Sequence, residues 1–180
     1  MERYVAFLRG MNLGGRRIKN EELKAEFEAL GFEQVATFRA SGNVVLATGK
    51  KEKEGALAGR IEKGLGEALG YEVPVFLRSC AEVVAIAERE PFEPEAVAAS
   101  EGKLQVSLLS KEPSAAAGRK ILALATDEDL LAVAGREVYW LPSGGILDSD
   151  LDLKALEAIV GADTRRTMGT IEQIAAKYCG

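Results

Sequence analysis

Residues 3–48 read RYVAFLRGMNLGGRRIKNEELKAEFEALGFEQVATFRASGNVVLAT. The segment Arg3–Arg9 alternates and concentrates Tyr, Val, Phe and Leu, a pattern that predicts a β-strand. Gln34–Ala40 and Asn43–Thr48 are also read as strands, and we expect a short hairpin at residues 41–42 to join them. The first quarter of the chain therefore predicts a strand, a helix and two further strands.

The helix between these strands has the clearest sequence signals of any element in the chain. Leu23, Phe27 and Leu30 recur at the spacing of one helix face, which predicts a buried stripe. Asn20 is the expected N-cap, because its side chain can accept a hydrogen bond from the first turn. Gly31 stands where a helix commonly ends in the left-handed conformation.

The pattern continues beyond residue 48 with a polar helix at about residues 51–69 and a strand at Glu72–Arg78. Pro74 cannot donate a hydrogen bond to a neighbouring strand, so we expect this strand at an edge or a bulge. The order strand, helix, strand, strand, helix, strand is that of the ferredoxin-like split βαβ arrangement.

The second half of the chain repeats most of this order. A helix at Ala81–Glu88 precedes a junction with two prolines, PFEPEAVAASEG, at residues 91–102. We expect the last strand of the repeat to be missing or very short. The predicted fold is α+β, with two ferredoxin-like (α/β plait) subdomains, 1–90 and 91–180, packed together. Its second half contains strands at 104–109, 130–134 and 137–141 and helices at 114–125, 151–160 and 168–178.

Composition excludes several classes of function. The chain has 180 residues, 23 basic and 28 acidic side chains, and a net charge of −5, which argues against indiscriminate nucleic-acid binding. It contains no histidine, which removes His-centred triads and His metal ligands. We predict no metal site, and the sequence leaves open whether the protein is an enzyme.

Cys80 and Cys179 are the two cysteines of the chain, and they lie far apart without CxxC spacing. With no signal-peptide pattern, they are interpreted as reduced thiols of a cytosolic protein. No apolar run approaches the ~18 residues of a membrane span. We therefore expect a cytoplasmic protein that does not enter the membrane.

The loop Arg9–Lys19 is the candidate binding element. It contains three glycines and four basic residues without an acidic one, and it leads from a strand into the N-terminus of a helix. Backbone N–H groups and the helix dipole make such a loop a candidate anion cradle. It matches neither the P-loop nor the GxGxxG dinucleotide fingerprint. The alternative is a flexible connection whose arginines are only solvated.

Two further segments carry polar candidates. Ser41-Gly42-Asn43 is interpreted first as a tight turn and second as a polar contribution to a shared pocket; Ser41 has no histidine to act as its base. Residues 164–170, TRRTMGT, are expected to open the last helix. A threonine there can cap the helix, and the arginines could hold a phosphate or carboxylate.

These segments together resemble the domain of unknown function 1697 family of bacterial proteins. The resemblance is carried by FLRGMNLGG at residues 7–15, EALGF at 28–32 and SGNVV at 41–45. Residues 167–169 depart from the closing motif of the family. The resemblance implies two plait-like subdomains and no established activity. It also implies that the signature positions of the family are Arg9, Gly10, Asn12, Gly14, Gly15, Ser41, Gly42, Asn43, Arg166 and Thr170.

We predict that the protein binds a small anionic or phosphate-bearing ligand through loop 10–19 and nearby arginines. An RNA-binding module is one alternative, although paired aromatic RNP segments are absent. A protein-interaction or oligomerisation domain without catalysis is the other. Cofactor and oligomeric state are not predicted. The predicted ligand-binding residues are Arg9, Gly10, Asn12, Gly14, Gly15, Arg16, Ser41, Asn43, Arg166 and Thr170.

Overall fold

The computed structural model describes residues 1–11, 18–40 and 42–180, and it divides the chain into two compact units. The first unit combines Met1–Ala85 with Ile174–Gly180, and the second is Ile86–Gln173. Each unit contains one four-stranded antiparallel sheet with helices. The architecture is α+β. The prediction of subdomains 1–90 and 91–180 had placed the C-terminal residues in the second half.

The first unit has its four strands in the order β2-β3-β1-β4. The central strands β1 and β3 pair antiparallel, with Tyr4 opposite Leu46. β4 is an edge strand, as expected, but it begins at Val75, so Pro74 precedes it and does not lie inside the strand predicted at 72–78. In chain order the elements are β1 (Glu2–Leu8), α1 (Asn20–Ala29), β2 (Glu33–Thr37), β3 (Asn43–Thr48), α2 (Glu54–Leu69) and β4 (Val75–Ser79).

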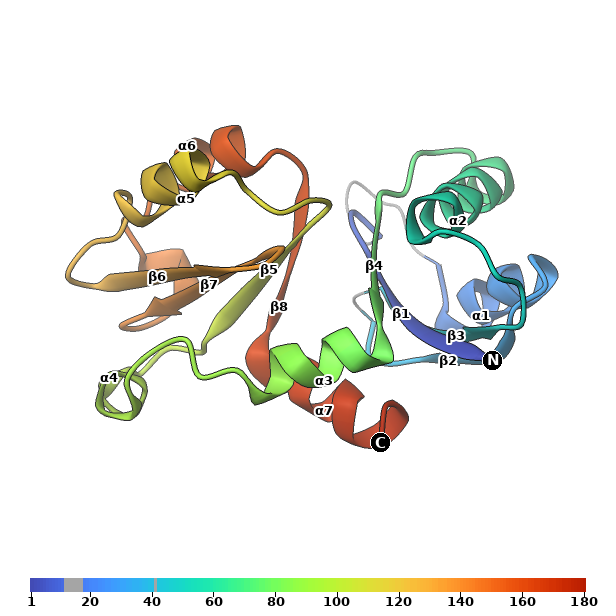
Figure 1. Cartoon of the computed structure of the whole chain (residues 1–180), viewed down its shortest axis with the longest axis horizontal. Helices are drawn as coiled ribbons and strands as arrows, with labels where there is room; N and C mark the ends of the chain where they lie inside the picture. The colour runs from blue at the N-terminus through green and yellow to red at the C-terminus, as the bar shows by residue number, and fades with distance from the viewer. Residues whose placement is uncertain (12–17, 41) are drawn as a thin grey trace. The chain divides into compact units, whose positions relative to one another are not determined.

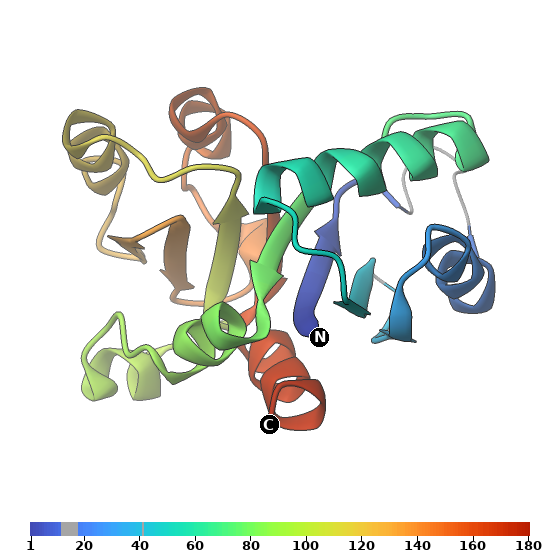
Figure 2. The ribbon, with the colours of Figure 1, turned by 45° about the vertical axis from the view of Figure 1, so that its right-hand side comes forward.

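The helices α1 and α2 cover one face of this sheet (Figures 1 and 2). The predicted helical stripe is confirmed for Leu23 and Phe27, which are buried, and Leu30 packs at the margin of the same core. Alternate residues of the strands complete this core, which is how a strand buries one of its faces. The cluster includes Tyr4, Ala6, Leu8, Leu23, Phe27, Val44, Leu46, Leu57, Ile61, Leu65, Val75 and Leu77.

The second unit has the strand order β6-β7-β5-β8, and α5 and α6 lie on one face of the sheet (Figure 1). Its core includes Leu109, Ile121, Leu131, Val138, Trp140, Leu151 and Leu156. The elements are α4 (Pro94–Ala99), β5 (Gln105–Leu109), α5 (Ala115–Leu122), β6 (Asp129–Ala134), β7 (Glu137–Pro142), a 3-10 turn η1 (Ile146–Asp148), α6 (Leu153–Val160) and β8 (Asp163–Thr167).

Two helices contain the division between the units. α3 (Cys80–Glu88) begins in the first unit and ends in the second, and α7 (Met168–Tyr178) runs the other way. Cys80 at the start of α3 and Cys179 just after α7 both belong to the first unit, and they form a disulfide with a Cα–Cα distance of 5.2 Å. The prediction of two reduced thiols is therefore wrong, because the fold brings together two cysteines that are 99 residues apart.

Three local predictions are also corrected. The last strand of the second unit is present as β8, and it contains Arg165 and Arg166, which we had expected in the segment that opens the last helix. The connection from β2 to β3 spans residues 38–42 and is longer than the predicted hairpin. Lys19 rather than Asn20 is the N-cap residue of α1.

Candidate functional site

The predicted loop is described only at its two ends, residues 9–11 and 18–20. Five predicted site residues lie outside the described residues: Asn12, Gly14, Gly15, Arg16 and Ser41. The described ends are nevertheless informative, because each is hydrogen-bonded to another segment of the first unit. We build the site from these contacts.

The start of the loop packs against the connection between β2 and β3. The N–H of Leu8, the last residue of β1, donates to the carbonyl of Gly42 at 2.8 Å. Gly42 has a φ of +79°, and a Cβ atom added there would lie 2.9 Å from Cγ of Met11 and 3.0 Å from Cβ of Leu8. Glycine is thus required both by the backbone conformation and by the close approach of the loop. The sequence alone had left the relative position of these two segments open.

Asn43 forms hydrogen bonds within the same connection. Its side-chain Nδ2 donates to the carbonyl of Phe38 at 2.9 Å, and the N–H of Phe38 donates to the carbonyl of Asn43 at 3.0 Å. Asn43 is only 1% exposed. A buried amide must find its hydrogen-bond partners inside the protein. The bond from Asn43 to Phe38 therefore fixes the conformation of the connection.

The far end of the loop reaches the same connection through Asn20. The side-chain Nδ2 of Asn20 donates to the carbonyl of Arg39 at 3.1 Å. Arg39 has a φ of +58°, a conformation that is uncommon for residues other than glycine, and its guanidinium carbon lies 5.4 Å from the centroid of the Phe38 ring. The side chain of Asn20 thus bonds the connection between β2 and β3, while Lys19 is the N-cap residue.

Arg9 and Gly10 complete the arrangement. The N–H of Arg9 donates to the carbonyl of Pro74 at 3.1 Å, which ties the end of β1 to the segment before β4. Gly10 has a φ of +75°, so the chain turns there in a conformation that suits glycine. We call residues 9–11, 18–20, 38–40 and 42–43 the loop-end site.

The loop-end site has a basic character. Arg9 is half-buried, whereas the side chains of Lys19 and Arg39 are exposed. The N-terminus of α1 adds the positive end of the helix dipole. Of the two acidic residues in the first turn, Glu22 accepts a hydrogen bond from the N–H of Lys19 at 3.4 Å. Lys19 and Arg39 were not among the predicted site residues, although Lys19 lies within the predicted loop and Arg39 two residues before the SGN turn.

Arg166 and Thr170, the remaining predicted site residues, belong to the second unit. Arg166 on β8 is 8% exposed, and its Nη1 donates to Oγ1 of Thr164 at 2.8 Å and to the carbonyl of Arg165 at 2.9 Å. Burial lowers the pKa of Arg166 to about 10, so the guanidinium remains charged at neutral pH. At the start of α7, Oγ1 of Thr167 accepts from the N–H of Thr170 at 3.2 Å.

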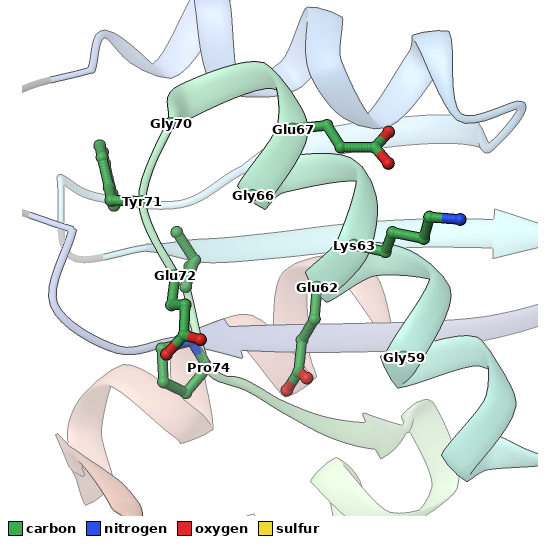
Figure 3. A pocket seen from close by; sticks show the side chains of 10 residues that line it. Gly59, Glu62, Lys63, Gly66, Glu67, Gly70, Tyr71, Glu72 and Pro74 are labelled. Carbon is green, nitrogen blue, oxygen red and sulfur yellow. The ribbon is translucent and has the colours of Figure 1, made fainter.

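A second feature of the first unit is a groove of about 750 Å³ between α2 and the segment that leads to β4, which we call the α2 groove (Figure 3). It carries the carboxylates of Glu62, Glu67 and Glu72 and the ammonium group of Lys63. Glu62 accepts a hydrogen bond from the N–H of Val75 at 3.0 Å. In Figure 3, Glu62 and Glu72 point toward the same side of the groove. The groove therefore has an excess of negative charge.

The chain matches a family model by sequence and is similar in fold to a solved structure. A sequence model of the family described as "Protein of unknown function (DUF1697)" matches residues 1–139. None of the curated proteins matches the chain. The fold is similar to that of the conserved bacterial protein SP0830 from Streptococcus pneumoniae, with a TM-score of 0.73 and 17% sequence identity over 98% of this chain and 97% of that one. Over the described residues, no helix has the length and apolar character needed to cross a membrane.

Proposed function

We propose that this protein, which belongs to the DUF1697 family of proteins of unknown function, binds a small anionic ligand at the loop-end site. A phosphate group is the favoured anion. The observation that carries the proposal is that Leu8, before the loop, and Asn20, after it, both hydrogen-bond the connection between β2 and β3. Arg9, Lys19 and Arg39 are sequence neighbours of these bonded residues or belong to them. The ferredoxin-like classification of the two units remains a prediction.

The chemistry of these residues suits a phosphate. Arg9 and Arg39 have planar guanidinium groups, which pair with two oxygens of one phosphate. The N–H groups of the first turn of α1 have no partner within the helix, and they favour an anion. Glu22 already accepts the N–H of Lys19, so we assign ligand contact to the N–H groups beyond Lys19. The predicted contacts Asn12, Gly14, Gly15 and Arg16 lie outside the described residues and stay predictions.

The roles of the other predicted residues follow from their contacts. Asn43 shapes the site, because its amide is already bonded to Phe38. Arg166 and Thr170 lie in the second unit, and their contact with an anion remains a prediction separate from the loop-end site.

Isothermal titration with pyrophosphate tests the proposal. We expect Arg9→Ala and Arg39→Ala each to weaken binding about tenfold or more, because a hydrogen bond to a charged group contributes about 1.5–3 kcal/mol. Arg119→Ala is the matched control, since Arg119 is an exposed arginine on α5 of the second unit. Arg166→Ala in the same series tests the predicted role of Arg166, with circular dichroism to monitor folding.

A control titration with chloride at matched ionic strength distinguishes binding at a specific site from general electrostatic attraction, which salt screens. If the parent protein does not bind pyrophosphate or phosphate, or if Arg119→Ala weakens binding as much as Arg9→Ala, the proposal fails. The RNA-binding alternative predicts instead that a short single-stranded RNA binds more tightly than pyrophosphate.

The α2 groove favours a second candidate function, the binding of a basic peptide segment of a partner protein. The side chains of Glu67, Glu72 and Lys63 make no hydrogen bond or ion pair within the described part of the chain, so the charge of the groove is not neutralised internally. A fluorescent peptide with alternating Lys and Ala tests this function. We expect binding that Glu67→Gln with Glu72→Gln abolishes and that Arg119→Ala leaves unchanged.

A further inference from the structure

The Cys80–Cys179 disulfide lies one residue away from a contact with the loop-end site. Cys80 follows β4 directly and begins α3, and Cys179 follows Tyr178, the last residue of α7. Sγ of Cys80 is 3.9 Å from the carbonyl oxygen of Tyr178. Both cysteines are half-buried, so a small thiol in solution can reach them.

Tyr178 connects this disulfide to the site. Its ring packs edge-on against the ring of Phe38, with the centroids 6.3 Å apart and the planes at 78°. Phe38 is the residue whose carbonyl and N–H are both bonded to Asn43, and the guanidinium of Arg39 lies over its ring. All these residues belong to the first unit. The contacts thus run without interruption from the disulfide to the basic residue Arg39.

We propose that Cys80 and Cys179 form a reversible redox pair whose disulfide state keeps the loop-end site in its binding conformation. This inference rests on the proposed function, because it names a regulation of the same site. The disulfide fixes the end of α7 against the start of α3 and so holds the Tyr178 ring on Phe38. Reduction releases the last residues of the chain, and the connection that presents Arg39 loses its aromatic support.

The chemistry is an exchange with a low-molecular-weight disulfide such as oxidised glutathione. One cysteine thiolate attacks glutathione disulfide, which forms a mixed disulfide and releases one glutathione thiol. The second cysteine thiolate then attacks the mixed disulfide, which forms the Cys80–Cys179 bond and releases the second glutathione. Two protein thiols lose two electrons and two protons, and one glutathione disulfide becomes two thiols.

The first experiment tests the redox pair without any anion. The protein is equilibrated in glutathione buffers of graded ratio, quenched with an alkylating reagent, and weighed by mass spectrometry. We expect one transition between a form with two alkylated cysteines and a form with none. A protein that carries two alkylated cysteines even in excess glutathione disulfide would overturn the proposal.

The second experiment tests the coupling. Pyrophosphate titration of the oxidised and the dithiothreitol-reduced protein should show at least a fivefold weaker affinity after reduction. Cys179→Ser should bind like the reduced protein in either condition. Tyr178→Ala should bind weakly even when oxidised, because the aromatic contact is lost, whereas Tyr178→Phe retains the ring and should bind like the parent. Equal affinity in both redox states would overturn the coupling.

Hydrogen exchange separates this inference from the proposed function. The amides of Phe38 and Asn43 should exchange faster after reduction whether or not pyrophosphate binds. If pyrophosphate binds neither state and these amides still respond to reduction, the proposed function fails and the redox control of the connection stands. If their exchange rates do not change, the redox control is wrong.

Discussion

Gly42 is the residue on which the geometry of the loop-end site depends most directly. A side chain there meets two obstacles, the positive φ of the backbone and the contact with Met11 and Leu8. We expect Gly42→Ala to lower the free energy of unfolding by about 1–3 kcal/mol, because left-handed strain and overpacking both contribute. Urea denaturation followed by circular dichroism measures this, and a loss below about 0.5 kcal/mol would contradict it.

Tyr4 gives the protein a pH dependence in the alkaline range. Burial, and then the hydrogen bond to Glu2, raise the pKa of Tyr4 to about 12 from its usual value of 10.0. The folded state therefore keeps the proton that the unfolded state loses, and stability falls as pH rises from about 10 to 12. Denaturation at pH 9, 10 and 11 should show a steeper loss for the parent than for Tyr4→Phe. Parallel curves would show that the pKa is not raised.

At the scale of the elements, the sequence predicted those that bury apolar side chains in a regular pattern. The predicted bounds of β3 and α7 agree with the structure, and Gly31, with a φ of +91°, ends α1 as expected. β8 was missed because its sequence, DTRRT, buries Thr164 and Arg166 in place of apolar residues. Hydrophobic periodicity contains no signal for such a strand.

The helix α2 contains glycines with different roles. A Cβ at Gly59 would meet no atom within 4 Å, whereas one at Gly64 would overlap Cδ2 of Leu30, the C-cap residue of α1, and lie 2.9 Å from its Cδ1. Alanine is favoured over glycine in a helix interior by about 1 kcal/mol. We expect Gly59→Ala to raise the free energy of unfolding by about 0.5–1 kcal/mol and Gly64→Ala to raise it less. A destabilised Gly59→Ala variant in urea denaturation would contradict this.

At the scale of the whole molecule, the disulfide closes a loop across 99 residues that contains the entire second unit. A cross-link over such a distance restricts the unfolded chain, with a typical stabilisation of about 2–5 kcal/mol. We therefore expect Cys179→Ser to lower the stability of the protein by about this amount. Thermal unfolding of the parent and Cys179→Ser, each with and without dithiothreitol, measures it. Identical curves for the oxidised parent and the variant would contradict the prediction.

Only part of the candidate site could be predicted from the sequence. Arg9 and Gly10 could be singled out, because a basic, glycine-rich loop between a strand and a helix is a local pattern. Arg39 could not be grouped with them, since its position depends on the hydrogen bonds from Asn20 to Arg39 and from Leu8 to Gly42. The pairing of Cys80 with Cys179 could not be predicted from the sequence either, because only the folded chain brings the two helix ends together.

The proposed anion site lies between the two ends of the loop. Two-dimensional NMR of the oxidised, ¹⁵N-labelled protein during a pyrophosphate titration tests it at the level of single amides. We expect saturable shifts that are largest at Gly10, Asn20 and Arg39 and are absent from β6 and β7 of the second unit. Shifts spread evenly over exposed basic residues, or none at these three amides at saturating pyrophosphate, would contradict it.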